Sequence, residues 1–156
     1  MKIGSLTTSY PADIEAFKEG WRRAQRSMQK LLPKFACPCC NVTNIHPQLA
    51  TALEKLMELF DMRRFKVHSG YRCAKHNEVV GGSPTSRHLT GQAIDFHITG
   101  LTLRDMYEVA QSLRVFKGIG VYKQWNNPGL HCDTRKGRAR WEQVDGVYRK
   151  GIKWNT

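Results

Sequence analysis

The chain has 156 residues, of which 40% are hydrophobic and 10% aromatic, and it carries a formal net charge of +12. This composition argues against a disordered chain, and the length suits a single domain that folds without disulfide bonds. No apolar run approaches the roughly 20 residues of a membrane span, and the first ten residues lack the apolar core of a secretory signal. We therefore expect a chain without a membrane span, made in the cytoplasm without a signal peptide.

Apolar residues recur every three or four positions over residues 11–32, which predicts an amphipathic helix ending before Pro33. The predicted apolar stripe consists of Ile14, Phe17, Trp21, Ala24, Met28 and Leu31. We take residues 1–33 as an N-terminal helical segment, either a docking helix or a part of the following domain. Residues 34–156 then form the main predicted domain, with a basic hairpin at its C-terminal end.

Three of the five cysteines follow this helix, at Cys37, Cys39 and Cys40. The C-x-x-C spacing of Cys37 and Cys40 is typical of structural zinc and redox sites. A zinc ribbon needs a second pair, whereas Cys73 and Cys132 stand isolated and far away in the sequence. Because five is an odd number, at least one thiol cannot pair within the chain. We favour free thiols, with a metal site or a disulfide at this cluster as the alternatives.

The rest of the chain alternates between helical and strand-like patterns. Helices are predicted over residues 47–60, 74–80 and 102–113, and strands over 65–68, 92–98, 118–122 and 130–134. Thr102 is the expected N-cap of the last helix, and Asp145-Gly146 is a two-residue hairpin signal. This order predicts an α+β fold, with a small, mostly antiparallel sheet flanked by helices.

Two of the predicted strands carry side chains that can bind a metal. Side chains alternate between the two faces of a strand, so Asp95 lies opposite the core residues of the strand over residues 92–98. In the strand over residues 130–134, His131 and Asp133 share a face. An isolated histidine or aspartate is more often structural than a ligand, and the prediction rests on their combination.

His88 lies in a turn just before the first of these strands, and Gly91 lets the chain fold back so that His88 can approach Asp95. Nitrogen atoms of His88 and His131 and one oxygen of Asp95 then make a three-ligand set. Such a set leaves the fourth position of a tetrahedral zinc ion open for water.

Residues 86–95, with the sequence SRHLTGQAID, fit the S-x-H-x-x-G-x-A-x-D signature of the D-alanyl-D-alanine carboxypeptidase-like zinc peptidases. The segments SGYR at 69–72, GIGVY at 118–122 and LHCD at 130–133 resemble further motifs of that family, in the same order. The chain therefore resembles this family from about residue 35 to residue 141. The family shares its fold with the hedgehog signalling domain and includes several phage endolysins.

The resemblance implies one zinc ion per chain. Its implied ligands are His88, Asp95 and His131. Arg72 is implied to lie beside the metal, where it neutralises an oxyanion or holds a substrate carboxylate; a surface ion pair is the alternative. Several members carry a glutamate three residues before the last ligand, where this chain has Pro128. We therefore take Asp133 as the candidate general base, as in the branch with H-x-D here, and a purely structural role is its alternative.

The other polar residues of these motifs are assigned no direct chemistry. His97 shares the face of Asp95 but lies about 6–7 Å further along the strand, so we expect it behind the ligands or on the substrate side. Ser86 is expected to shape the turn or bond a ligand, not to act as a nucleophile. The histidines without metal-like spacing are His46, His68 and His76.

The resemblance implies a zinc-dependent peptidase that hydrolyses peptide bonds of bacterial peptidoglycan, as a D,D-carboxypeptidase or an endopeptidase. Seven basic residues lie between positions 135 and 153, interleaved with Trp141, Tyr148 and Trp154, which suits anionic wall polymers and sugar rings. Charge, compact size and the lack of a signal peptide suggest a monomeric phage lysis enzyme that reaches the cell wall by a phage-type route.

Two other functions are weighed against this one. The first is a non-catalytic, zinc-bound wall-binding or structural module of the same fold, favoured by the missing glutamate at position 128. The second is a nucleic-acid binder, suggested by the net charge and the C-x-x-C. We do not expect nucleic acid as a partner, because no recognition-helix or zinc-finger spacing accompanies these features.

Overall fold

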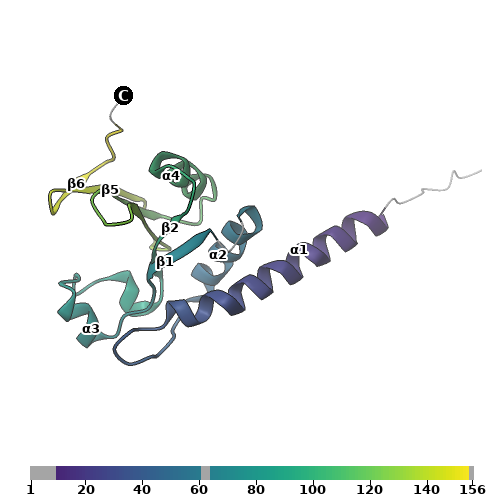
Figure 1. Cartoon of the computed structure of the whole chain (residues 1–156), viewed down its shortest axis with the longest axis horizontal. Coiled ribbons are helices and arrows are strands. Elements are labelled where there is room, and N and C mark those ends of the chain that lie inside the picture. The colour runs from purple at the N-terminus through teal and green to yellow at the C-terminus, as the bar shows by residue number, and fades with distance from the viewer. Residues whose placement is uncertain (1–9, 61–63, 155–156) are drawn as a thin grey trace, which may run out of the picture.

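A six-stranded sheet forms the centre of the computed structural model, which describes residues 10–60 and 64–154 (Figure 1). The strands are β1 (Phe65–Ser69), β2 (Ala93–Ile98), β3 (Gly118–Tyr122), β4 (Gly129–Asp133), β5 (Ala139–Val144) and β6 (Val147–Lys150). Their spatial order is β1-β2-β4-β3-β5-β6, and among the described strands only β3 and β5 run parallel. The predicted α+β fold with a mostly antiparallel sheet is confirmed.

Among the described residues, the four α-helices lie close to their predicted bounds, whereas the two short 3-10 helices, η1 and η2, were not predicted. They are α1 (Tyr10–Leu31), η1 (Leu32–Phe35), α2 (Pro47–Leu59), α3 (Ala74–Val79), η2 (Arg87–Thr90) and α4 (Leu103–Ser112). Thr102 caps α4 as predicted, since its hydroxyl accepts a hydrogen bond from the amide of Asp105 at 3.1 Å. Asp145 and Gly146 both have positive φ, as the predicted hairpin turn between β5 and β6 requires.

The hydrophobic core lies between the sheet and the helices α2 and α4. The alternation predicted for β2 is confirmed, because Ile94, Phe96 and Ile98 are buried in this core. The rings of Phe65 and Phe96 stack with centroids 4.7 Å apart and bind β1 to β2. The opposite face of β2 is thereby left to Asp95, which can face a cleft because its neighbours fill the core.

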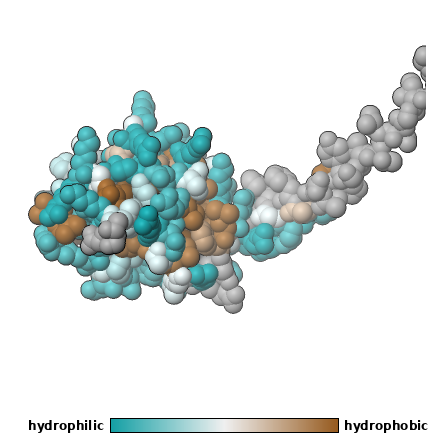
Figure 2. Space-filling view, turned by 90° about the horizontal axis from the view of Figure 1, so that it is seen from above, coloured by the Kyte–Doolittle hydropathy of each residue, from teal (hydrophilic) through white to brown (hydrophobic). Residues whose placement is uncertain are grey.

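Helix α1 extends away from the globular body, as Figures 1 and 2 show. Near its C-terminal end Met28 and Leu31 are buried and join the core beside α2, whereas Ile14 is exposed. The other members of the predicted stripe, Phe17, Trp21 and Ala24, lie outside the described side chains. In the part of the chain that is described, no helix has both the length and the apolar character needed to cross a membrane.

Candidate active site

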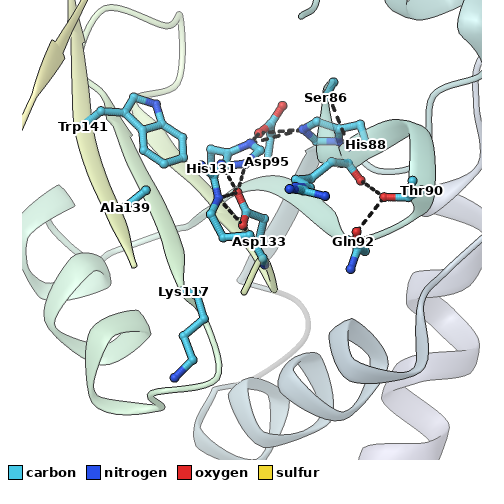
Figure 3. A network of polar contacts seen from close by, with 12 residues as sticks. Ser86, His88, Thr90, Gln92, Asp95, Lys117, His131, Asp133, Ala139 and Trp141 are labelled. Atoms are coloured by element: carbon cyan, nitrogen blue, oxygen red, sulfur yellow. Dashed lines mark hydrogen bonds and ion pairs between the residues drawn. The ribbon is translucent and has the colours of Figure 1, made fainter. Parts of the chain in front are cut away.

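Three side chains meet at one point beside the centre of the sheet (Figure 3). Oδ1 of Asp95 lies 3.2 Å from Nε2 of His88 and 2.8 Å from Nδ1 of His131. The two ring nitrogens are themselves 3.2 Å apart. A tetrahedral zinc ion with bonds of about 2.0–2.1 Å separates its ligand atoms by about 3.3 Å. The three atoms therefore have the spacing of one face of a zinc coordination sphere.

The backbone places each of these side chains. Asp95 and His131 are direct partners in the antiparallel pairing of β2 with β4, so their side chains emerge next to each other on the same face. His88 comes from η2, where the hydroxyl of Ser86 accepts a hydrogen bond from the amide of His88 at 3.3 Å. Gly91 ends η2 with φ of 66°, and a Cβ there would lie 2.3 Å from the carbonyl oxygen of Asn44. The chain thus folds back at Gly91, as predicted, and His88 reaches Asp95.

Hydrogen bonds fix which nitrogen of each imidazole is free. Nδ1 of His88 lies 2.6 Å from the carbonyl oxygen of Gly70, and Nε2 of His131 lies 3.0 Å from Oδ2 of Asp133. Both partners only accept hydrogen bonds, so these two nitrogens carry the protons and donate. In the neutral imidazoles, which are the form that binds a metal, the lone pairs of the remaining nitrogens point at the common centre.

Arg72 lies at the edge of this centre. Its Nη2 donates to Oδ2 of Asp95 at 2.7 Å, and its Nε donates to the hydroxyl of Ser69 at 2.8 Å. The side chain is only 15% exposed. The guanidinium is therefore held in one orientation beside the oxygen of Asp95 that does not face the histidines.

The carboxylate of Asp133 lies behind His131 and is fully buried. It accepts the hydrogen bond from His131, and it also pairs with the guanidinium of Arg135, whose Nε lies 2.8 Å from Oδ1. The backbone amide of Arg135 donates to the same oxygen at 3.0 Å. Both carboxylate oxygens are thus engaged on the side of the ring away from the three converging atoms.

The electrostatics of the cluster keep both carboxylates ionised. In the zinc-free protein, burial raises the pKa of Asp95, but attraction to the imidazoles of His88 and His131 in their protonated forms outweighs this effect and holds the pKa of Asp95 well below its usual range. For Asp133, burial is likewise outweighed by hydrogen bonds from His131 and Arg135, and its pKa is lowered. Burial disfavours protonated His131, yet its bonds to Asp133 and Asp95 raise its pKa to about 9.

An open cleft of about 790 Å³ leads to the three converging side chains. One group of lining residues is aromatic: Tyr122, Trp125, Trp141 and Tyr148. Another is polar and includes Arg72, Ser83, Thr85, Ser86, Arg87 and Arg135. Asp95 is the one carboxylate among the described lining residues, so the cleft is cationic and suits a ligand with carboxylate groups.

The structure gives several residues surroundings that the sequence analysis did not predict. His97, expected behind the ligands or on the substrate side, pairs with His68 at 2.9 Å and lines a separate cavity. Tyr122 and Trp125 were missed as cleft residues, although two aromatic residues at and just beyond the end of a strand are a signal that could have found them. Cys73 was taken as isolated, and the structure brings it to the three N-terminal cysteines.

Comparison with known proteins agrees with this geometry. The sequence profile of the peptidase M15 family matches residues 11–133. The chain is 34% identical over 145 residues to the peptidoglycan L,D-endopeptidase MepK of Escherichia coli (strain K12), covering 88% of this chain and 78% of the relative. The proteins of that name from Escherichia coli O157:H7 and Shigella flexneri match to the same extent. The chain therefore belongs to the peptidase M15 family.

Proposed function

We propose that this chain is a zinc-dependent peptidase that hydrolyses a peptide bond of bacterial peptidoglycan. The observation that carries the proposal is the convergence of His88, Asp95 and His131 at the cleft, with free lone pairs spaced for one zinc ion. The names of the relatives, which are peptidoglycan endopeptidases, support the substrate class. A cationic cleft with aromatic walls fits the stem peptides, which carry several carboxylates.

Each side chain then has a distinct task. His88, Asp95 and His131 would hold the zinc ion, which when bound would supply Lewis-acid polarisation of the scissile carbonyl and activation of water for attack. Arg72, held by Asp95 and Ser69, offers its remaining N–H groups to the developing oxyanion or to a substrate carboxylate. The zinc position is reached from the cleft, so a peptide can approach it.

For Asp133 we propose a positioning role. Its buried carboxylate holds the ring of His131 with Nδ1 turned to the metal position, as carboxylates behind metal-binding histidines do. The alternative, that Asp133 is the general base, needs an oxygen facing the cleft, and both of its oxygens bond Arg135 or His131. The two roles predict different responses of an Asp133→Asn variant to added zinc.

The proposal also specifies which peptide bond of peptidoglycan is hydrolysed. We propose endopeptidase action on an L,D bond, because the relatives carry that activity in their names. The sequence also suggested a D,D-carboxypeptidase, which removes one terminal D-alanine and leaves cross-links intact. A role in phage lysis and binding of wall polymers by the basic residues 135–153 remain predictions from the sequence.

The test is digestion of purified sacculi by the zinc-loaded protein, with released and remaining peptides identified by mass spectrometry. Parallel samples contain a chelator or the Asp95→Asn variant. We expect cross-linked dimers to be converted to monomers by cleavage at an L,D bond, and we expect both controls to be inactive. Loss of terminal D-alanine alone would instead identify a carboxypeptidase.

The second candidate function is the non-catalytic wall-binding module. It is favoured by the absence of a free carboxylate among the described lining residues of the cleft and by Pro128 in place of a glutamate. Co-sedimentation with sacculi, without release of any fragment from several wall chemotypes while zinc stays bound, would favour this function over the peptidase.

A further inference from the structure

Four cysteines gather at the start of α3, on the side of the site that carries Arg72. The sulfur atoms of Cys37, Cys39, Cys40 and Cys73, which we call the cysteine cluster, all lie within 4.8 Å of one another. Sγ of Cys39 is 3.1 Å from that of Cys73 and 3.8 Å from that of Cys37. Four sulfurs around a zinc ion, with bonds of about 2.3 Å, are separated by about 3.8 Å. The cluster therefore has the dimensions of a four-thiolate zinc site.

A tight turn brings three of these sulfurs together. The amide of Asn41 donates to the carbonyl of Cys37 at 2.8 Å, and the amide of Cys37 donates to the carbonyl of Val42 at 2.9 Å. Asn41 takes a left-handed conformation with φ of 56°, which closes the turn. Within this turn Cys37 and Cys40 have the C-x-x-C spacing of zinc ligands.

Backbone amides point at the sulfur atoms. The amide of Cys73 lies 3.4 Å from Sγ of Cys37, and the amide of His76 lies 3.4 Å from Sγ of Cys73. Donors of this kind stabilise the negative charge of a thiolate, the form that binds a metal. Cys73 is thus the N-cap of α3, and its sulfur faces the other three.

Burial in the core does not explain the cluster. Cys37 is buried, but Cys39 and Cys40 are exposed and Cys73 is half-buried. A set of thiols that only filled space would lie in the core, as Cys132 does. The described cysteines are all free, since a disulfide needs sulfurs about 2.0 Å apart. A metal ion would account for exposed thiols that converge in this way without forming disulfide bonds.

We propose that the cysteine cluster binds a second zinc ion, which has a structural role. With four sulfur ligands the ion has no open position for water, so it takes no part in hydrolysis. It joins the turn after η1 to residues 70–73, two segments that also meet through the bond from the amide of Tyr71 to the carbonyl of Phe35.

The position of this zinc ion gives it a direct bearing on the active site. Residues 70–73 supply the carbonyl of Gly70, which orients His88, and the guanidinium of Arg72, which pairs with Asp95. Cys73 is the next residue after Arg72. A zinc ion at the cysteine cluster therefore fixes the segment that positions one metal ligand and the candidate oxyanion residue.

The test is the zinc content of the full chain, purified under reducing conditions and measured by native mass spectrometry and elemental analysis. We expect two zinc ions per chain in the parent protein and one in Cys39→Ser and Cys73→Ser. The matched control Cys132→Ala removes a thiol outside the cluster and should retain two. A single zinc ion in the parent that persists in Cys73→Ser, or a mass two daltons lower that reports a disulfide, overturns the proposal.

Cobalt substitution keeps the test decisive if the serine variants fold poorly. In the Asp95→Asn variant, which loses the histidine site, cobalt should still give the intense thiolate-to-metal charge-transfer bands of a four-sulfur site. Absence of these bands in a folded Asp95→Asn protein would refute the second zinc. The cobalt spectrum does not depend on peptidase activity. The proposal of a second zinc ion can therefore be refuted or supported independently of the proposed peptidase function.

A last measurement addresses the role of the site. Hydrogen exchange of the amides in residues 36–42 and 70–76 should rise in Cys73→Ser, while exchange in α4 stays as in the parent. Unchanged exchange in both segments would show that the zinc ion, if bound, does not hold them.

Discussion

Oδ2 of Asp133 lies 3.0 Å from Nε2 of His131, on the far side of the imidazole from the Nδ1 that faces Asp95. This relationship decides what an Asp133→Asn variant should do. If Asp133 positions His131, the variant should bind zinc about 10–100-fold more weakly, and excess zinc should restore much of its activity. Zinc competition titrations and activity at rising zinc concentrations measure this. Normal zinc affinity together with activity that no zinc concentration restores would instead identify Asp133 as the general base.

The three converging side chains should be required for the zinc ion at the cleft. Asp95→Asn removes the charge that both histidines face, and we expect it to lose that zinc ion and all detectable peptidase activity. His97→Ala is a matched control, because His97 lies on the same face of the same strand but lines another cavity. Elemental analysis and sacculus digestion check both variants. Retention of the full zinc content by Asp95→Asn would contradict the assignment.

Arg72 should act on the reaction without holding the metal. Arg72→Gln removes a charged donor beside Asp95, so we expect kcat/KM to fall by roughly 10²–10³, with the zinc content retained. Arg72→Lys keeps the charge but loses the fixed fork that bonds both Asp95 and Ser69, and should recover only part of the activity. Steady-state kinetics on a soluble cross-linked peptide measure these effects. An unchanged kcat/KM in Arg72→Gln would show that the ion pair of Arg72 with Asp95 has only a structural role.

Gly118 should be intolerant of any side chain, because β3 runs directly beside the carboxylate of Asp133. A Cβ at Gly118 would lie 2.3 Å from Oδ2 of Asp133, whereas one at Gly137 would meet no atom within 4 Å. We expect Gly118→Ala to lower the free energy of unfolding by about 1–3 kcal/mol and to weaken zinc binding by displacing Asp133. Gly137→Ala should be close to neutral. Denaturant unfolding of the two variants provides the comparison, and equal stability would refute the expected clash.

The zinc-free protein should show the titration of His131 directly. Burial opposes protonation, but the bonds to Asp133 and Asp95 raise the pKa of His131 to about 9, above its ordinary value of 6.5. The stability that protonated His131 contributes is therefore fully present below pH 6.5 and is lost as the pH rises through 9. NMR titration of the ring should give a midpoint near 9 in the zinc-free parent and a lower one in Asp133→Asn. A midpoint near 6.5 in the parent would contradict the network of hydrogen bonds.

Much of the site follows from the sequence alone. The two-residue period of β2 and β4 determines that Asp95 and His131 lie on the face opposite the core, whatever the neighbouring strands are. Gly91 indicates that the chain reverses there, because glycine adopts at little cost the positive φ that such a turn needs. The helix bounds and the hairpin follow from equally local signals, such as the capping by Thr102 and the turn at Asp145-Gly146.

Other features depend on the tertiary structure. Sequence spacing separates Cys73 from Cys37 by 36 positions, and only the packing of the segment after β1 against Phe35 brings their sulfur atoms together. The face shared by His131 and Asp133 was predictable, but not that Asp133 is closed off by Arg135 and Gly118. The physical reason is that periodicity is a local property of the backbone. It fixes the direction in which a side chain leaves its strand, whereas its partners come from segments distant in sequence, which only the packed fold brings into contact.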